Sequence, residues 1–316
     1  MHKEQLLVSV VINSFNQAAF LEQTILSVLT QDYPHLEVIL VDGGSTDGSL
    51  EIIQRYAERF AWWVSEKDSG QAEGINKGLE RAQGSLVAWL NSDDTYLPGA
   101  VSKAAASFQQ FPSAVLIYGD VMAVDVQGNP IHQMHTGNWQ LVDLMEFHIL
   151  NQPAVFMNGA VLRRVGGLDR NFHYLLDHQL WLRLAVSGQM MHIAENWATG
   201  RFHAGAKNVA AASRFGEEAY RIAAWMRVTP PYTTLGQGRW HRVEAGAHRL
   251  NARYLLDGGQ PRQALAAYFK GIHAYAPLVL PEWHRMLYAI LSLAGLAGIK
   301  KLYLRLRGAL RPARLE

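Results

Sequence analysis

The chain has 316 residues, 49% hydrophobic and 18% charged, and this balance excludes a mostly disordered protein. Its 29 basic and 27 acidic residues leave a net charge of +2, too small an excess to indicate a nucleic-acid binder. The absence of cysteine excludes a disulfide scaffold, a cysteine nucleophile and a thiolate metal site, and it fits a reducing compartment. Any metal site must therefore use oxygen or imidazole ligands.

The first 90 residues alternate apolar runs with segments that carry apolar residues at helical spacing. The apolar runs predict strands, and the intervening segments predict helices. The predicted strands cover 6–12, 36–41, 62–64 and 86–90, and the predicted helices cover 19–31, a segment that begins near 49, and 71–82. This pattern is typical of a parallel sheet covered by helices on both faces, in which ligands bind beyond the carboxyl ends of the strands.

Three of these predicted strands end in polar residues: Asn13 and Ser14, Asp42, and the pair Asp93 and Asp94. Because parallel strands end at the same edge of a sheet, these side chains are expected to converge. The paired carboxylates have two interpretations. They form either a polar strand end with a helix N-cap, or a site for Mg²⁺ or Mn²⁺ that substrate phosphates complete.

The alternation fades after about residue 125. A helix is predicted over 177–187, and helices are predicted for the chain from about residue 215 onward. Within that region, residues 250–276 predict a helical hairpin with a break at 258–261. A single tetratricopeptide-like unit is the alternative interpretation of that hairpin. The predicted domains are 1–212, an α/β domain, and 213–316, a helical region with a basic amphipathic tail.

The tail carries the charge asymmetry of the chain. Residues 285–316 hold seven Lys/Arg and one acid, a net charge of +6, so the preceding part carries +2 − 6 = −4. Apolar residues at helical spacing predict a basic amphipathic helix, which either lies on an anionic membrane surface or packs on its own domain. The uncharged stretch 286–299 is too short to span a bilayer. A cytoplasmic protein, with peripheral binding to the inner face of the cytoplasmic membrane as an option, is expected.

Five sequence blocks, in order and with matching spacing, resemble those of family 2 glycosyltransferases. They are residues 10–16, 38–49, 68–79, 82–84 and 90–94. The resemblance spans roughly residues 6–205 and implies the GT-A fold, a Rossmann-like mixed α/β sheet with helices on both faces, followed here by a C-terminal helical region. It also implies a nucleotide-diphosphate sugar donor and a divalent cation.

Carried over by position, the resemblance assigns the first strand ends to the nucleoside. Asn13 and Ser14 would line its pocket, and Asp42 would accept a hydrogen bond from the base. Gly43 would let the backbone turn close to the ligand.

The later blocks are assigned to the rest of the donor. Asp68 and the segment from Gly70 to Asn76 would border the ribose and diphosphate. Asp93 would hold the ribose or the sugar, and Asp94 would ligate Mn²⁺ or Mg²⁺.

Residues 175–183 resemble the base motif of the family, Glu-Asp-x-Asp-Leu-x-x-Arg. Asp177 falls on its catalytic aspartate, which would remove the acceptor proton as bonding to the anomeric carbon develops. Leu176 and Gln179 replace the two other acids. The alternative makes Asp177 the N-cap of the following helix.

Two residues beyond the base motif complete the predicted site. Arg201 would pair with the diphosphate as a bidentate donor. His203 would be a third metal ligand, better suited to Mn²⁺ than to Mg²⁺, or else a surface histidine. Gln152 is expected on the acceptor side, and Trp181 in the core.

These assignments predict an inverting glycosyltransferase that uses a UDP-type donor and a hydroxyl acceptor. The acceptor is expected to be a saccharide or a lipid-linked saccharide of a bacterial surface polysaccharide. A nucleotidyltransferase is disfavoured, because the loop at 13–17 has no basic residue. A non-catalytic binding or scaffold subunit on a degenerate transferase fold stays open, because the base motif has lost two acids.

Overall fold

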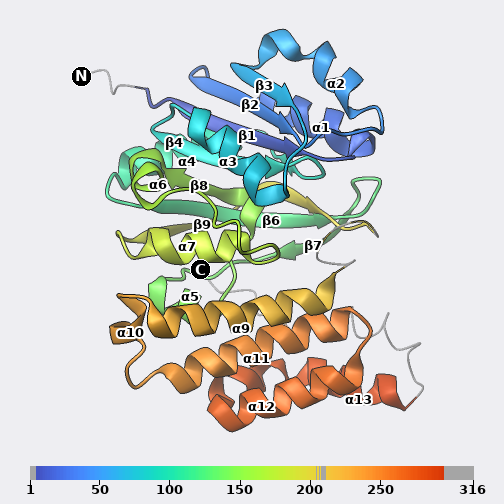
Figure 1. The fold of residues 1–316 in the computed structure, drawn as a ribbon, viewed down its shortest axis with the longest axis vertical. Coiled ribbons are helices and arrows are strands. Elements are labelled where there is room, and N and C mark those ends of the chain that lie inside the picture. Colours follow the sequence, from blue (N-terminus) through green and yellow to red (C-terminus); the bar gives the residue numbers. More distant parts are fainter. Residues whose placement is uncertain (1–4, 204, 206, 208–210, 295–316) are drawn as a thin grey trace. The chain divides into compact units, whose positions relative to one another are not determined.

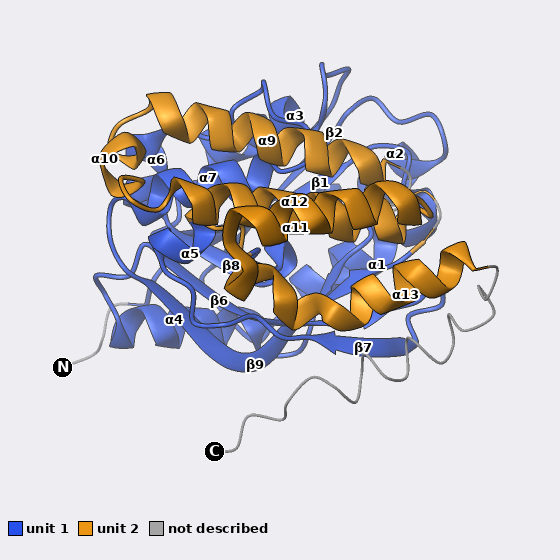
Figure 2. Ribbon diagram, turned by 90° about the horizontal axis from the view of Figure 1, so that it is seen from below, with its two compact units in different colours: residues 1–144, 149–202 blue, residues 145–148, 203–316 orange. Residues whose placement is uncertain are grey.

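The computed structural model describes residues 5–203, 205, 207 and 211–294. The chain forms two compact units, one of residues 1–144 and 149–202 and the other of residues 145–148 and 203–316 (Figure 2). The predicted α/β region thus lies mainly in the first unit and the predicted helical region in the second. The domain boundary at 212 stays a prediction.

The first unit contains a mixed sheet of nine strands among the described residues. Its order is β3-β2-β1-β4-β8-β6-β9-β5, and β7 pairs with β6 (Figure 1). The strands are β1 (Val8–Ser14), β2 (Leu36–Asp42), β3 (Trp62–Ser65), β4 (Leu86–Asn91), β5 (Thr95–Tyr96), β6 (Leu116–Val124), β7 (Pro130–Met134), β8 (Val155–Asn158) and β9 (Met190–Arg201).

Helices cover both faces of this sheet, as the sequence predicts. The helices of the α/β region are α1 (Ala18–Leu29), α2 (Ser49–Arg55), α3 (Gln71–Arg81), α4 (Ala100–Gln110), α5 (Leu141–Met145), α6 (Gly159–Val165) and α7 (Leu176–Ala185). Alternate β1 residues Val10 and Ile12 share one buried cluster with α1 and α4. On the opposite face α3 comes so close to β1 that a Cβ on Gly78 would lie 2.3 Å from Cγ1 of Val11.

The parallel strands β1, β2, β3 and β4 end together. Ser14 is in register with Asp42, which is in register with Ser65, and Asn13 is in register with Asn91. Two backbone hydrogen bonds continue this alignment into the loops, from Gly43 N to Ser14 O and from Ser92 N to Asn13 O. The predicted convergence of the polar strand ends is therefore confirmed.

The second unit is helical where the structure describes it. Its helices are α9 (Ala212–Val228), α10 (Tyr232–Leu235), α11 (Trp240–Asp257), α12 (Pro261–Val279) and α13 (Trp283–Leu293). The chain breaks between α11 and α12 where the sequence predicts it, and these two helices share a core that includes Ala252, Leu256, Ala264 and Tyr268. None of the helices in the described part of the chain combines the length and the hydropathy needed to cross a membrane.

Candidate active site

Asp42 organises the loop that follows β2. Its carboxylate is completely buried, and its Oδ2 accepts hydrogen bonds from Gly44 N at 3.1 Å, Ser45 N at 2.9 Å and Ser65 Oγ at 2.7 Å. The positive φ of Gly44, 81°, allows the backbone to turn back onto this carboxylate. Oδ1 accepts from the hydroxyl of Ser45, so protein donors occupy both carboxylate oxygens, and the hydrogen bond from a nucleobase stays a prediction.

The loops after β1 and β2 are tied to each other by side chains. Asn16 N donates to Ser45 Oγ at 2.7 Å, and its Oδ1 accepts from Thr46 N at 2.9 Å. Asp47 accepts from Ala18 N at 2.9 Å, which joins the second loop to the start of α1. Sequence analysis did not single out Asn16 and Asp47 as site residues, although both lie within the blocks that carry the family resemblance.

Two buried polar atoms at the end of β1 have no hydrogen-bond partner within the described residues: Oδ1 of Asn13 and Oγ of Ser14. Buried polar atoms are nearly always paired in folded proteins, so two adjacent orphans at a strand end are typical of a ligand site. Their location agrees with the nucleoside role that the resemblance implies for both residues.

The carboxylate of Asp68 is packed between two glycines. Its Oδ2 lies where a Cβ on Gly43 would be 2.9 Å away and a Cβ on Gly74 would be 2.7 Å away. Its Oδ1 accepts from Gly70 N at 3.0 Å, next to the start of α3. A side chain at Gly43 or Gly74 would displace this carboxylate, which explains the glycines and holds Asp68 beside the β2 loop.

Asn76 has protein partners where the resemblance implies the donor. Its Nδ2 donates to Leu168 O at 2.8 Å, and its Oδ1 accepts from Leu168 N at 2.7 Å. A Cβ on Gly167 would lie only 2.2 Å from the same Oδ1. The side chain of Asn76 therefore joins α3 to the loop between α6 and α7, and its contact with a donor stays a prediction.

The loop after β4 presents Asp93 and Asp94. Asp94 is 7% exposed, its Oδ1 accepts from Arg201 N at 3.0 Å, and its backbone oxygen accepts from Thr24 Oγ1 at 2.7 Å. Burial raises the pKa of Asp94 well above its usual range, and the neighbouring carboxylate of Asp93 raises it further. A group that is costly to ionise in this position is one that a bound cation would stabilise.

Arg201 braces this loop from the end of β9. Its Nε donates to Asp93 O at 3.0 Å, and its Nη1 donates to Asp125 O at 3.1 Å and to Val126 O at 2.9 Å. Nη2 donates to Gln23 Oε1 at 2.9 Å. With four hydrogen bonds to protein oxygens, the guanidinium holds the acidic loop, and its predicted pairing with the diphosphate is untested.

The acidic pair fits a cation that takes part of its coordination shell from a substrate. Among the described residues, no group of three or more His, Asp or Glu side chains is arranged to hold a metal ion. Mg²⁺ in particular is usually held by one or two carboxylates, with substrate phosphates and water as the other ligands. Asp94 could supply such a carboxylate, and its ligation of a cation stays a prediction, as does that by His203, which belongs to the second compact unit.

Asp177 lies in the first turn of α7. The helix begins at Leu176 with Leu175 as its N-cap, so the alternative prediction, Asp177 as the N-cap, is wrong. Its carboxylate accepts from His178 N at 2.7 Å. Trp181 is completely buried and stacks on Trp89 of β4 with 5.1 Å between ring centroids, which confirms its predicted core position.

The altered base motif keeps its local structure. Gln179, which replaces an acid, accepts from Arg183 Nε at 3.0 Å through Oε1. Arg183 also donates to Val165 O at 2.9 Å, Gly166 O at 3.0 Å and Gly167 O. An amide oxygen can accept this bond as a carboxylate would, so the substitution still allows Arg183, in the last turn of α7, to tie the helix to the loop between α6 and α7.

The comparison of sequences decides the family. The profile of glycosyl transferase family 2 matches residues 9–165, which include the strand-end loops described above. The chain belongs to this family through these residues. The resemblance of the five sequence blocks is thereby confirmed.

Two relatives of the chain are named for bacterial polysaccharide synthesis. A putative teichuronic acid biosynthesis glycosyltransferase of Bacillus subtilis is 41% identical over 129 residues, which are 40% of this chain and 50% of the relative. An O-antigen biosynthesis protein of Myxococcus xanthus is 30% identical over 201 residues, 62% of this chain and 15% of the relative. The first of these matches spans only half the length of the relative.

Solved glycosyltransferase structures share the fold. Staphylococcus aureus TarS, in complex with UDP-GlcNAc, matches with a TM-score of 0.59 and 17% identity over 98% of this chain and 93% of that one. The mannosyltransferase PcManGT of Pyrobaculum calidifontis, in complex with GDP-Man and Mn²⁺, matches with a TM-score of 0.63 and 19% identity over 98% and 84%. The predicted GT-A fold is confirmed.

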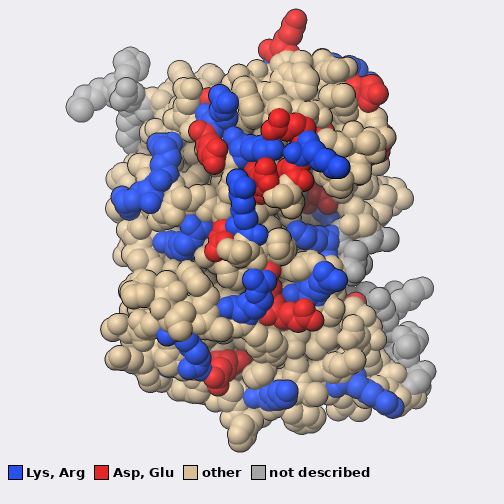
Figure 3. Space-filling view, viewed as in Figure 1, with Lys and Arg blue, Asp and Glu red and all other residues tan. Residues whose placement is uncertain are grey.

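The surface of the family 2 glycosyltransferase mixes charges of both signs. On the face drawn in Figure 3, basic and acidic side chains are interspersed. At α3, Lys77 pairs with Glu66 at 2.9 Å and with Glu73 at 3.6 Å, and Arg170 lies 3.7 Å from Glu73. Lys77 is therefore engaged with two glutamates.

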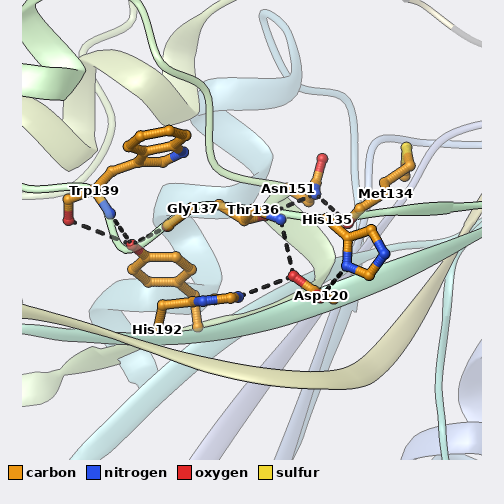
Figure 4. Close-up of polar contacts among 9 residues, drawn as sticks. Asp120, Met134, His135, Thr136, Gly137, Trp139, Asn151 and His192 are labelled. Atoms are coloured by element: carbon orange, nitrogen blue, oxygen red, sulfur yellow. Dashed lines mark hydrogen bonds and ion pairs between the residues drawn. The ribbon is translucent and has the colours of Figure 1, made fainter. Parts of the chain in front are cut away.

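A polar cluster that sequence analysis missed is centred on Asp120 in β6 (Figure 4). Its Oδ1 lies 2.9 Å from His192 Nε2 and accepts from Thr136 N at 2.8 Å, and its Oδ2 lies 2.8 Å from His135 Nδ1. Burial alone would raise the pKa of Asp120, but the hydrogen bonds from His192, Thr136 and His135 outweigh it and hold the pKa below its usual range. No local sequence signal joins these residues, because they meet only through tertiary structure.

Proposed function

We propose that this chain is an inverting glycosyltransferase that moves a sugar from a nucleotide-diphosphate donor to a hydroxyl group. The alignment of three polar strand ends carries the proposal, because it brings the orphaned atoms of Asn13 and Ser14, the Asp42 loop and the acidic pair to one edge of the sheet. In open α/β sheets this edge is where ligands bind.

In the proposed reaction the acceptor oxygen forms a bond to the anomeric carbon while the bond from that carbon to the diphosphate oxygen breaks. Asp177 takes the acceptor proton, and the nucleoside diphosphate leaves on the opposite face, so the configuration inverts. A divalent cation at Asp94 would neutralise charge on the leaving diphosphate, with Asp93 beside it for the ribose or the sugar. Arg201 holds the acidic loop in position for that role.

A UDP-type donor is the first expectation, because the sequence blocks resemble those that bind uridine nucleotides in this family. The structures similar in fold supply two donors to compare, since TarS was solved with UDP-GlcNAc and PcManGT with GDP-Man. The proposed acceptor is a saccharide or lipid-linked saccharide of a bacterial surface polysaccharide. The names of the teichuronic acid and O-antigen relatives support that class.

A thermal-shift screen of UDP- and GDP-sugars, with and without Mn²⁺, tests donor binding directly. A ligand that binds only the native state stabilises it by about 2.7 kcal/mol at a concentration 100 times its Kd, which raises the Tm measurably. We expect a shift with one nucleotide class that grows with Mn²⁺, and a smaller Mn²⁺ effect in Asp94→Ala. No shift with any donor, at concentrations up to several millimolar, would contradict the proposal.

A non-catalytic scaffold is the competing function, and donor hydrolysis separates the two. A transferase is expected to release nucleoside diphosphate slowly in the presence of the cation and without acceptor, because water can replace the acceptor hydroxyl. A scaffold would bind the donor in the thermal-shift screen and release none. The retained contacts of Gln179 and Arg183, which tie α7 to the loop before it, support the transferase.

A further inference from the structure

Helix α13 of the second unit has its charged side buried and its apolar side exposed. Glu282 at its N-cap, Arg285 and Ala289 are all less than 8% exposed. The other side carries only apolar side chains, each between 44% and 53% exposed: Leu280 just before the helix, Trp283, Leu287, Ile290 and Leu293. We name these five residues the apolar face. A usual surface helix turns its polar side to solvent, whereas α13 exposes this second apolar stripe although Met286 and Ala289 already pack in the core.

The buried charges fix this orientation. Glu282 accepts from Tyr268 at 2.9 Å and pairs with Arg253, and Arg285 reaches Asp257 at 3.5 Å. Burial alone would raise the pKa of Glu282, but Arg253 and the other nearby arginines outweigh it and lower the pKa to about 2. Rolling α13 over to hide its apolar face would separate these buried partners, which is strongly destabilising. These contacts therefore hold α13 with its apolar face toward the solvent.

The sequence that follows this helix is strongly basic. Residues 295–316 contain six Lys/Arg and one acid, a net charge of +5. Basic residues next to an apolar surface favour an anionic bilayer, and Trp is a frequent residue at the membrane interface. A second copy of the chain would bring a second +5 segment to the same contact, which disfavours self-association through this face.

We infer that the apolar face of α13 inserts into the surface of an anionic lipid bilayer, a partner that the net positive charge of the sequence after the helix favours. The helix lies in the plane of the membrane, since one apolar face along its length reaches only the boundary of headgroups and acyl chains. The inference rests on α13 and the sequence after it, so it is independent of the proposed sugar transfer.

The absence of cysteine allows a direct test with one introduced label. Leu287→Cys carries the environment-sensitive dye nitrobenzoxadiazole on the apolar face, and Glu217→Cys carries it at an exposed site on α9 as the control. Vesicles of phosphatidylcholine with phosphatidylglycerol are expected to increase and blue-shift the fluorescence at position 287 only. Pure phosphatidylcholine is expected to have little effect.

Three results would overturn the inference. A dye at position 287 that is already shielded and does not respond to vesicles would indicate that the chain itself covers the face. A signal that changes with protein concentration, without lipid, would indicate a second copy. An equal response at positions 217 and 287 would indicate non-specific adsorption.

Charge variants test the same face without a label. The double variant Leu287→Glu and Ile290→Glu adds two negative charges, and each unit charge near an anionic surface changes binding about fivefold, so vesicle partitioning falls about 30-fold. Val228→Glu, a change of the same kind at a 77% exposed position at the end of α9, should partition like the unmodified chain within about twofold. Equal partitioning of both variants would contradict the inference. Circular dichroism checks that each remains folded.

Discussion

The loop after β4 and the start of α7 each present a carboxylate proposed to act in the same reaction, and the protein holds the two in opposite ways. Asp94 is buried, and the backbone N–H of Arg201, more than 100 residues later in the chain, fixes one of its oxygens. Asp177 is half-buried in the first turn of a helix, and its oxygen accepts from the residue that follows it. One position depends on long-range contacts and the other on local helix geometry.

This difference matches two kinds of chemistry. A carboxylate in a fixed, buried position is suited to hold a cation, because the cation compensates the charge that burial makes costly. A carboxylate near a helix N-terminus and partly open to solvent can take up and release a proton in each turnover. The comparison therefore predicts that changes at the two positions affect different kinetic quantities.

The largest effect is expected from Asp94→Ala. Loss of a metal-ligating carboxylate removes several kcal/mol of charge stabilisation, so kcat with Mn²⁺ should fall about 10⁴-fold. Titration of activity with Mn²⁺ checks this. The slow release of nucleoside diphosphate by donor hydrolysis should no longer depend on the cation in this variant. Normal turnover of Asp94→Ala at saturating donor and Mn²⁺ would contradict the role of Asp94 in holding the cation, and with it the contrast between Asp94 and Asp177.

Asp177→Asn should lower kcat about 10³-fold, within the range that general-base catalysis contributes, and leave donor binding unchanged. The amide preserves the size of the side chain but cannot accept the acceptor proton. Thermal shifts with the donor measure binding, and product formation at saturating substrates measures kcat. Full transfer activity in this variant would remove Asp177 as the base.

The part of the molecule that sequence predicts best is the first half of the sheet. Strands β1 to β4 are continuous apolar runs with short polar ends, so both their extent and the convergence of Asn13, Asp42 and Asp94 follow from local pattern. The family blocks add the roles of these ends, and the family itself is confirmed. Local pattern suffices here because each strand carries its own signal.

The remaining contacts could not be predicted, because they join residues far apart in the chain. Arg201 bonds to carbonyl groups 75 to 108 residues earlier, and backbone carbonyls leave no signature in the sequence. The histidine partners of Asp120 come from β9 and from the segment after β7, which become neighbours of β6 only when the sheet forms. The amphipathic helix predicted from Leu296, Ile299, Tyr303, Leu306 and Leu310 lies outside the described residues. No sequence signal indicated that the ion pair of Glu282 with Arg253 would hold the apolar side of α13 outward.

Asn76→Ala tests whether Asp177, like Asp94, is positioned by a contact between residues far apart in the chain. The variant leaves the backbone N–H and C=O of Leu168 without partners, which should lower the free energy of unfolding by about 2 kcal/mol. We expect kcat to fall about tenfold as the loop before α7 loosens, with the donor KM unchanged.

Urea unfolding and steady-state kinetics measure both effects of Asn76→Ala. The control is Asn171→Ala, which changes an exposed asparagine within the same loop, and little effect is expected there. A raised donor KM with unchanged stability would instead support the donor contact that the family resemblance implies for Asn76.

The smallest effect is expected at Asp120, which tests the role of burial away from the acidic loop. Asp120 is buried like Asp94, yet its pKa moves in the opposite direction, because hydrogen bonds from two imidazoles and a backbone N–H satisfy its charge. Since the pKa is lower in the folded than in the unfolded state, ionised Asp120 stabilises the protein above the unfolded pKa of about 4. That contribution is lost as pH falls through the folded pKa. Asp120→Asn should therefore lower the free energy of unfolding by about 2 kcal/mol at pH 6 and by progressively less below pH 4.

Urea unfolding at pH 6, 5, 4 and 3 measures this difference, with Asp32→Asn, a change at an exposed carboxylate, as the control. A difference that grows as pH falls would mean that Asp120 is neutral in the folded protein. Burial would then govern Asp120 as it governs Asp94, and the imidazoles would not compensate it. A difference that shrinks would leave Asp94 as the buried carboxylate whose pKa is raised, and a bound cation would stabilise the charged form of such a group.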